Sequence, residues 1–251
     1  MQMFDLTGKA AIVTGGNGGI GFGIAEGLAE AGASVMLAGR NQAKGDAAAR
    51  KLGAKAAFTA GDVTRKADCE LLVAATVARF GRLDILVNNA GTSIRQPPQN
   101  FTEAQWHHIL DTNLTSAFLL CQAAYPELLR TGGGKIINIG SLNSLIAAPH
   151  NVPYTASKGG ILQMSRGLAT AWAANNIQVN AILPGWIETE MTEGAKAQVP
   201  GLNENVLART PAGRWGKPRD LAGLAVFLAA PASDFITGTG IAADGGYSIR
   251  A

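Results

Sequence analysis

The chain has 251 residues, of which 47% are hydrophobic and 16% are charged, and its formal net charge is +3. A chain of this size buries roughly three quarters of its unfolded surface, so it needs neither disulfides nor a structural metal to fold. The basic residues are scattered, which argues against nucleic-acid binding. The longest apolar run, 221–232, is too short to cross a bilayer, so we expect no membrane partner.

Cysteine and histidine usage points to a cytoplasmic protein without a metal. Cys69 and Cys121 are far apart and form no C-x-x-C motif, and isolated thiols of this kind are typical of a reducing compartment. The three histidines have no metal-ligand spacing. The segment 1–6 lacks the basic start and apolar core of a signal peptide, so we expect none.

Strand-like and helix-like segments alternate along the chain. Apolar runs predict strands at 10–13, 34–38, 56–60, 84–87, 135–139, 178–182 and 240–243. Helical patterns fall at 19–31, 42–52, 65–80, 102–129 (one helix or two), 153–174 and 219–228. This alternation predicts an α/β fold, a single doubly wound domain over 1–251 with helices on both faces of a parallel sheet. Its ligand should bind beyond the carboxyl ends of the strands.

One long stretch, 184–214, is irregular, with proline and glycine spaced around short helical pieces. Loops of this length in a compact domain are often lids over an active site. We therefore expect a substrate lid at 184–214, the alternative being a surface excursion.

A glycine-rich turn follows the first strand and opens the first helix. Strand, glycine turn and helix start are the context that a phosphate-binding loop requires, because free amides at a helix start bind anions. Spacing alone does not decide which glycines form the motif. Gly16, Gly18 and Gly21 fit G-x-G-x-x-G, whereas Gly15, Gly19 and Gly21 fit G-x-x-x-G-x-G.

A second set of residues suits proton transfer. Tyr154 and Lys158 stand four apart at the start of a helical stretch, so their side chains share one helix face. A cation one turn away favours the phenolate, and we expect it to lower the pKa of the phenol. Ser141 follows the strand at 135–139. A hydroxyl, a tunable phenol and an ammonium are suited to alcohol and carbonyl chemistry.

Together these motifs resemble those of the short-chain dehydrogenase/reductase family, in order and spacing, over nearly the whole chain. The matching residues are Thr14-Gly15-x-x-x-Gly19-x-Gly21, Asn88-Asn89-Ala90-Gly91, Asn113, Ser141, Tyr154-x-x-x-Lys158, Pro184-Gly185 and Asp244-Gly245-Gly246. The resemblance implies a Rossmann fold with a seven-stranded parallel sheet. It also favours the register of Gly15, Gly19 and Gly21.

The resemblance implies four catalytic residues. Tyr154 would be the general acid and base, and Lys158 would lower the phenol pKa and hold the nicotinamide ribose. Ser141 would hydrogen-bond the substrate oxygen. Asn113 would anchor a water that passes protons from Lys158 towards solvent, the alternative being an amide that packs between helices.

A nicotinamide cofactor is also implied. Asp62 would meet the adenine amino group, Thr189 would bind the carboxamide, and the segment 88–91 would close the cleft. The residues assigned to the cofactor are Gly15, Asn17, Gly19, Ile20, Gly21, Arg40, Asp62, Val63, Asn89, Ala90, Gly91, Tyr154, Lys158, Pro184, Gly185, Ile187 and Thr189.

The second strand favours NADP(H), with NAD(H) as the alternative. NAD-dependent members usually carry an acid at the end of this strand for the ribose 2′-hydroxyl. Here Arg40 occupies that region, and the next acid, Asp46, lies in the following helix. A guanidinium suits a 2′-phosphate. Gly18, where some NADPH-dependent members carry a second basic residue, is uncharged.

Several stretches resemble the gluconate and deoxygluconate dehydrogenase branch of the family: 93–95, 152–158 and 210–216. This favours a sugar acid or polyol as the small-molecule substrate. Arg95 could reach a substrate carboxylate, although it could equally be a surface charge or a subunit contact. Asn143 and His150 could bind hydroxyls, Trp186 could cover a sugar face, and Ser141 completes the substrate set.

Two other functions compete with this interpretation. A 3-oxoacyl carrier-protein reductase shares every catalytic motif but needs a basic patch for its acidic carrier, and no such patch is evident. A non-catalytic nucleotide sensor would not need Tyr154 and Lys158. The resemblance further implies a homotetramer built on the helices at 102–129 and 153–174 and on the C-terminal segment.

Overall fold

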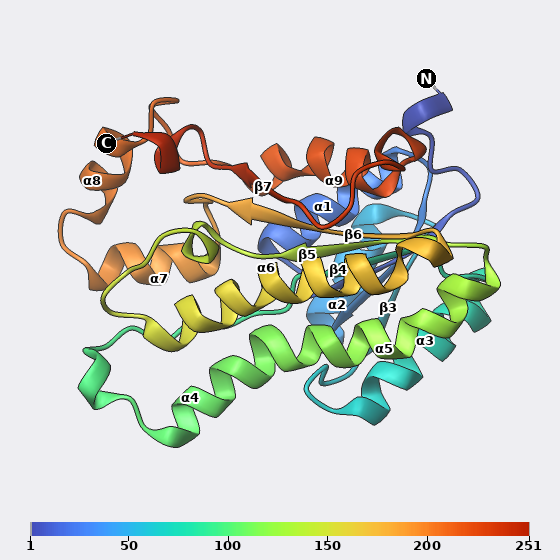
Figure 1. Cartoon of the computed structure of the whole chain (residues 1–251), viewed down its shortest axis with the longest axis horizontal. Coiled ribbons are helices and arrows are strands. Elements are labelled where there is room, and N and C mark those ends of the chain that lie inside the picture. The colour runs from blue at the N-terminus through green and yellow to red at the C-terminus, as the bar shows by residue number, and fades with distance from the viewer. Residues whose placement is uncertain (1, 251) are drawn as a thin grey trace.

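The computed structural model describes residues 2–250 as an α/β fold around one parallel sheet (Figure 1). The strands are β1 (Ala10–Thr14), β2 (Ser34–Gly39), β3 (Ala56–Ala60), β4 (Ile85–Asn88), β5 (Gly134–Ile139), β6 (Ile177–Pro184) and β7 (Gly240–Ala243). Their order is β3-β2-β1-β4-β5-β6-β7, and every neighbouring pair is parallel. The doubly wound seven-stranded sheet expected from the sequence is confirmed, with strand ends shifted by no more than two residues.

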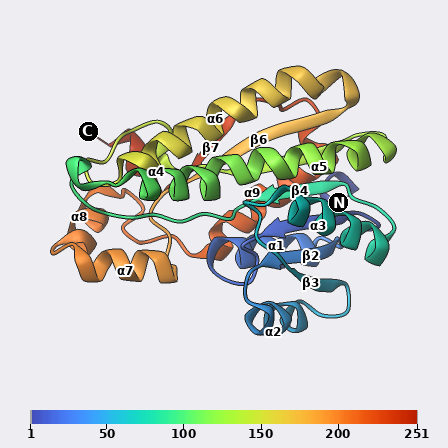
Figure 2. The ribbon, with the colours of Figure 1, turned by 90° about the horizontal axis from the view of Figure 1, so that it is seen from below.

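Helices cover both faces of this sheet (Figure 2). They are α1 (Gly19–Glu30), α2 (Gln42–Leu52), α3 (Lys66–Phe80), α4 (Glu103–Leu110), α5 (Ser116–Arg130), α6 (Val152–Trp172), α7 (Glu190–Gln198), α8 (Leu202–Arg209) and α9 (Ala222–Ala229). Helices α1, α2 and α9 share one hydrophobic core with the strands, and α3, α5 and α6 share the other.

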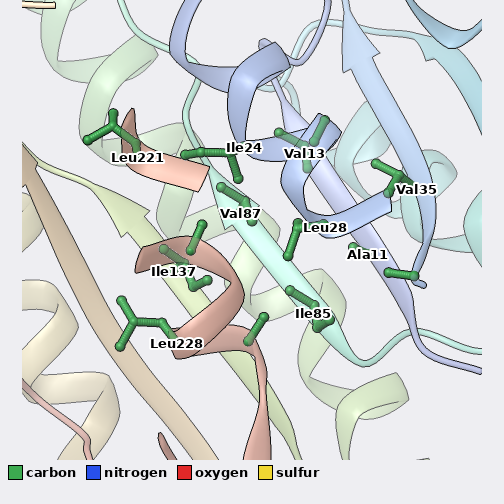
Figure 3. Packing of buried hydrophobic residues seen from close by; sticks show 14 of the residues in the cluster. Ala11, Val13, Ile24, Leu28, Val35, Ile85, Val87, Ile137, Leu221 and Leu228 are labelled. Carbon is green, nitrogen blue, oxygen red and sulfur yellow. The ribbon is translucent and has the colours of Figure 1, made fainter. Parts of the chain in front are cut away.

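Alternation along the central strands divides the apolar residues between these two cores. In β1, Ala11 and Val13 face α1 and α9, whereas Ile12 faces α3 and α5. Successive side chains of a strand point to opposite faces, and a parallel sheet is covered on both. Figure 3 shows the first core, where Ile24 of α1 and Leu228 of α9 pack over the central strands. The continuous apolar runs of the sequence reflect this double burial.

The segment 102–129, expected as one helix or two, forms a continuous helical path with a defect. Helices α4 and α5 are joined by a π-helical turn over Asp111–Thr115 instead of a loop. Such single π turns are frequent at functional sites because they redirect a side chain without ending the helix. Here the buried residue of the turn is Asn113. The expected helix at 219–228 likewise begins as a 3₁₀ turn, Pro218–Leu221, before α9.

The segment 184–214 contains α7 and α8, which lie at the left of Figure 1 beyond the carboxyl end of β6. Its residues Ala195, Leu202 and Val206 are buried in a small hydrophobic cluster with Trp215, which follows the segment. The C-terminal segment runs beside α8, where the Arg250 guanidinium donates to the carbonyl of Ala208. We call residues 184–214 the lid segment after the role expected from the sequence, which stays a prediction.

Candidate active site

A cavity of about 700 Å³ opens at the carboxyl ends of the strands. It runs from the ends of β2 and β3, past the glycine turn after β1, to Ser141 after β5 and the first turns of α6. All the residues assigned to the cofactor line it except Gly21, and Ser141 does as well. The cavity is therefore one continuous cleft that joins the expected phosphate-binding loop to the expected proton-transfer residues.

The glycine turn follows the register of Gly15, Gly19 and Gly21. Gly15 has φ 60° and Gly19 has φ 50°, a region that residues with a Cβ rarely adopt. Gly18 has φ 180°, so its backbone does not require glycine. Gly21 is buried, and a Cβ there would overlap the Gly15 carbonyl, so it allows α1 to pack closely against the turn.

Thr14 and Asn89 hold this turn against the neighbouring strand. The Thr14 hydroxyl accepts hydrogen bonds from the amides of Asn89 (2.9 Å) and Ala90 (3.0 Å). The Asn89 side-chain amide donates to the Thr14 carbonyl at 2.9 Å and the Gly15 carbonyl at 3.3 Å. The segment 88–91 thus forms one wall of the cleft by fixing the turn. The sequence analysis did not assign Thr14 this bridging role.

The far end of the cleft holds Arg40 and Asp62. Arg40 is exposed at the end of β2, and its neighbours in the chain, Gly39 and Asn41, are uncharged. Asp62 accepts from the amide and hydroxyl of Thr64 at 3.0 and 2.8 Å, and these hydrogen bonds lower the pKa of its carboxyl. The nearby charge of Arg40 acts in the same direction. Asp62 is therefore an ionised acceptor at neutral pH.

The proton-transfer residues meet at the inner end of the cleft. Ser141 begins a short 3₁₀ turn, and its hydroxyl accepts from the Asn143 amide at 3.1 Å. Tyr154 and Lys158 face it from the first two turns of α6. The Lys158 ammonium lies 5.6 Å from the centre of the Tyr154 ring. A hydroxyl, a phenol and an ammonium thus line one wall of the same cavity.

The pKa of the phenol differs from the sequence-based expectation. Burial raises the pKa of Tyr154, while hydrogen bonding with Ser141 and the charge of Arg95 oppose that rise. The Lys158 ammonium donates to the Ile139 carbonyl at 2.7 Å rather than to the phenol. Burial lowers the pKa of Lys158 to about 8. The spacing of the two residues indicated their shared face but not this competing backbone acceptor.

Asn113 connects the π turn to α6. Its side-chain oxygen accepts from the Thr92 amide at 2.7 Å, and its amide donates to the Thr92 carbonyl and the Ser157 hydroxyl, both at 3.0 Å. Ser157 in turn donates to the Tyr154 carbonyl at 2.7 Å. Asn113 is 2% exposed and does not line the cleft. In this structure it positions the segment after β4 and the start of α6.

A buried polar network, absent from the sequence analysis, fixes α6 against the sheet. The Asn88 amide donates to Asn138 at 2.8 Å, and the Asn138 amide donates to the Ser165 hydroxyl at 2.8 Å. These residues come from β4, β5 and α6, which also carry or precede the expected catalytic groups. Buried amides are costly unless they are paired. Asn88 and Asn138, each in a largely apolar strand, were the sequence signal from which a buried polar network could have been predicted.

Two of the expected substrate residues lie together. The Arg95 guanidinium lies 5.7 Å from the centre of the Trp186 ring, at the start of the lid segment. Trp186 also packs edge-on against Trp215, at 5.4 Å, and Tyr247, at 6.5 Å. Arg95 is close enough to Tyr154 for its charge to affect the pKa of the phenol. The sequence analysis missed Trp215 and Tyr247, which come from distant segments.

The other two substrate candidates are placed differently. The Asn143 amide donates to the Thr155 hydroxyl at 3.1 Å and is also 3.4 Å from the Asn151 side-chain oxygen, so it ties the loop after β5 to α6. His150 is exposed, and its carbonyl accepts from the Gln96 amide at 2.9 Å. Neither residue lines the main cavity, and neither do Arg95 and Trp186. None of these four expected substrate residues therefore forms part of the wall of the cleft.

The lid segment touches the glycine turn across the cleft. Thr189 caps α7, and a Cβ on Gly19 would lie 3.3 Å from the Thr189 methyl group. Ile187, Glu190 and Met191 also line the cavity. The start of the lid segment is therefore one wall of the cleft.

Within residues 2–250, no group of three or more His, Cys, Asp and Glu side chains is arranged to hold a metal ion. Nor does that part of the chain contain a helix that is both long and apolar enough to span a membrane. Cys69 and Cys121 are buried as free thiols, and burial raises their pKa values to about 11 and about 12.

The fold and the cleft agree with comparisons to known proteins. A family model described as enoyl-(acyl carrier protein) reductase matches residues 15–248. The chain belongs to the short-chain dehydrogenase/reductase family.

Its relatives include enzymes named for sugar acids. It is 40% identical to gluconate 5-dehydrogenase of Gluconobacter oxydans, over 99% of this chain and 98% of that one. It is 41% identical to 2-dehydro-3-deoxy-D-gluconate 5-dehydrogenase of Escherichia coli, over 100% and 99% of the two chains. A solved gluconate 5-dehydrogenase from Burkholderia cenocepacia, in complex with NADP and tartrate, superposes with a TM-score of 0.94 at 39% identity, covering 100% of this chain and 99% of that one.

Proposed function

We propose that the protein is an oxidoreductase that moves a hydride between NADP(H) and a secondary alcohol or ketone of a sugar acid. The observation that carries the proposal is the single cleft that joins the glycine turn and Arg40 at one end to Ser141, Tyr154 and Lys158 at the other. A nucleotide-binding loop alone would fit a sensor, but three proton-transfer groups at its inner end fit a catalyst.

The residues of the cleft fit a dinucleotide. The positive φ angles at Gly15 and Gly19 bring backbone amides close to the start of α1, where a pyrophosphate would bind. Asp62 and Arg40 would hold the adenosine end, and Lys158, Ile187 and Thr189 the nicotinamide end. The nicotinamide, when bound, supplies the hydride acceptor or donor.

Tyr154 would move the proton. In oxidation its phenolate takes the proton from the substrate hydroxyl, and in reduction its phenol returns a proton to the substrate oxygen. Ser141 donates a hydrogen bond to that oxygen, which stabilises negative charge as it develops. The ammonium of Lys158 favours the phenolate once it turns from the Ile139 carbonyl towards the ribose and the phenol.

Arg40 supports NADP(H) over NAD(H). Its guanidinium stands at the end of β2, where a carboxylate would repel a 2′-phosphate. Several structural neighbours were solved with bound NADP, among them the B. cenocepacia enzyme. NAD(H) remains the alternative cofactor, to be separated by the affinity measurements below.

Arg95 and Trp186 support a sugar acid as substrate. A guanidinium near Tyr154 suits a carboxylate, and an indole beside it suits the apolar face of a carbon chain. The names of the relatives point to the same substrate class.

Turnover of a substrate panel tests the proposed reaction. The panel contains gluconate, the hexitol of matching stereochemistry and a 3-oxoacyl thioester, each with both cofactors. We expect sugar-acid turnover with NADP(H) at the highest kcat/KM. Preferential reduction of the thioester would favour the carrier-protein reductase, and no turnover of any alcohol or ketone would contradict the enzyme assignment.

We also propose a cytoplasmic homotetramer. Trp106, Phe118 and Leu129 of the α4–α5 helix are 37%, 42% and 40% exposed, and Phe235 and Ile249 near the C-terminus are 103% and 85% exposed. Apolar side chains at such exposure mark interfaces when they cluster on one element. Light scattering should give about four times the 25.8 kDa chain mass. A fully active monomer would contradict the assembly.

A further inference from the structure

The cleft contains a lysine that the cofactor assignment leaves unused. Lys44 lies in the first turn of α2 and lines the same end of the cavity as Arg40 and Asn41. Its amide donates to the Asn41 side chain at 2.9 Å, which fixes the backbone at this position. Its ammonium lies 2.7 Å from a carboxylate oxygen of Glu190, on α7 across the cleft.

The ion pair between Lys44 and Glu190 is exposed and easily exchanged. The lysine side chain is 44% exposed and the glutamate side chain 87% exposed. Ion pairs at this exposure contribute little to stability, because water and salt screen both charges. A ligand of higher charge can therefore displace the carboxylate at small cost.

The Lys44 side chain lies beside Gly18. A Cβ on Gly18 would lie 3.5 Å from the Cε and 3.6 Å from the Nζ of Lys44, which are ordinary contact distances. The φ of 180° at Gly18 suits any residue, so a side chain at this position would point to the same place as the lysine. The ammonium of Lys44 therefore lies over the glycine turn, within the cleft.

Two cations therefore flank one end of the cleft, Arg40 at the end of β2 and Lys44 over the glycine turn. A phosphate monoester carries close to two negative charges at neutral pH and attracts an ammonium more strongly than the single charge of Glu190 does. Lysine acts on a phosphate as a point charge with three donors, and so needs no planar alignment.

We propose that Lys44 is a specificity-determining residue whose ammonium leaves Glu190 to bind the 2′-phosphate of NADP(H). This inference rests on the proposed function and names a further residue that selects its cofactor. Lys44 then favours NADP(H) over NAD(H), and Glu190 competes with the phosphate for the same ammonium.

The competing role for this ion pair is a clasp that joins α2 to α7 over either cofactor. A clasp predicts that loss of Lys44 or of Glu190 weakens NADP⁺ and NAD⁺ alike. A phosphate-binding lysine predicts effects of opposite sign for the two residues, confined to ligands that carry the 2′-phosphate.

The affinities of NADP⁺, NAD⁺, 2′,5′-ADP and 5′-AMP distinguish the two roles without any substrate. Lys44→Ala should lower the affinities for NADP⁺ and 2′,5′-ADP about tenfold and leave those for NAD⁺ and 5′-AMP within twofold of wild type. Glu190→Gln should tighten NADP⁺ by up to about fivefold. Lys51→Ala, at the other end of the same helix, is the matched control and should change no affinity.

A second variant, which places a cation at position 18 instead of position 44, tests directly where the 2′-phosphate binds. In the Lys44→Ala background, Gly18→Arg should restore the preference for 2′,5′-ADP over 5′-AMP, because its side chain enters the space that Lys44 occupied. If the double variant binds 2′,5′-ADP as weakly as Lys44→Ala does, the placement of the Lys44 ammonium at the 2′-phosphate is wrong. Parallel weakening of NADP⁺ and NAD⁺ in Lys44→Ala and Glu190→Gln overturns the proposal in favour of the clasp.

The wild-type protein separates this inference from the proposed function. If it binds NADP⁺ no more tightly than NAD⁺, the cofactor part of the proposed function fails. If it prefers NADP⁺ and Lys44→Ala keeps that preference, the proposed function stands and the role of Lys44 fails.

Discussion

The two ends of the cleft are built in different ways. The proposed cofactor end consists of short contiguous segments at strand ends, several of them rich in glycine. The proposed substrate end gathers side chains from four separate parts of the chain: Arg95 after β4, the loop after β5, Trp186 and Trp215 around the lid segment, and Tyr247 near the C-terminus. On this proposal, cofactor binding follows from local motifs, whereas we expect substrate choice to depend on tertiary packing.

The largest expected effect lies where the two ends meet. Tyr154→Phe removes only the proton donor, so kcat should fall by roughly 10²–10⁴-fold while NADP⁺ affinity stays within twofold. Steady-state kinetics and cofactor titration measure the two quantities. Tyr125→Phe, which removes a surface hydroxyl bonded to Asn175, is the control and should be fully active. A near-normal kcat in Tyr154→Phe would contradict the role of Tyr154 as the proton donor.

The next test confines an effect to the cofactor end. Arg40→Ala should lower the affinity for NADPH by about ten- to a hundredfold and leave that for NADH almost unchanged. The reason is that only the 2′-phosphate of NADPH makes the charge-assisted hydrogen bond. Arg50→Ala, at the far end of α2, is the matched control. Equal losses for both cofactors would mean that Arg40 supports the fold of the cleft rather than selecting a phosphate.

The pH dependence of cofactor binding tests Lys158. Burial lowers the pKa of its ammonium to about 8, so the cation is present below that pH and lost above it. Cofactor affinity should therefore weaken as pH rises through about 8, approaching tenfold for each pH unit at most. Titrations between pH 6.5 and 9.5 on wild type and Lys158→Met measure this, and the variant should lose the pH dependence. If the pH profile of cofactor affinity is unchanged in Lys158→Met, the pH dependence comes from another titrating group.

The smallest effect concerns the substrate end. Arg95→Gln should raise KM for a sugar acid about tenfold, because a charge-assisted hydrogen bond to the carboxylate is lost. The matching hexitol lacks that carboxylate and serves as an internal control, with KM unchanged. The affinity of NADP⁺ should not change either. A loss shared by acid and hexitol would show that Arg95 acts through its stacking on Trp186.

The same contrast explains what could be predicted from sequence. All seven strands followed from local patterns, because apolar runs act over a few residues. The glycine register was open from spacing alone and followed from the family resemblance, and the positive φ angles of Gly15 and Gly19 agree with it. The face shared by Tyr154 and Lys158 followed from helical spacing. Fold and reaction class were thus readable from the chain.

Contacts between distant segments could not be read in this way. The Ile139 carbonyl that holds Lys158 in this structure lies nineteen positions away from it on another element. Trp215 and Tyr247 join Trp186 only after the lid segment and the C-terminus have folded together. The π turn that buries Asn113 has no local sequence signal, since its residues read as ordinary helix.

The separate hydrophobic cluster of the lid segment has an evolutionary consequence. Ala195, Leu202, Val206 and Trp215 form a cluster apart from the two cores that hold the sheet, although Ile187 of the same segment packs in the first core. We therefore expect substitutions within this cluster to leave the sheet and the nucleotide loop intact. If the proposed substrate role of the segment holds, copies of such a gene would diverge first in what they recognise.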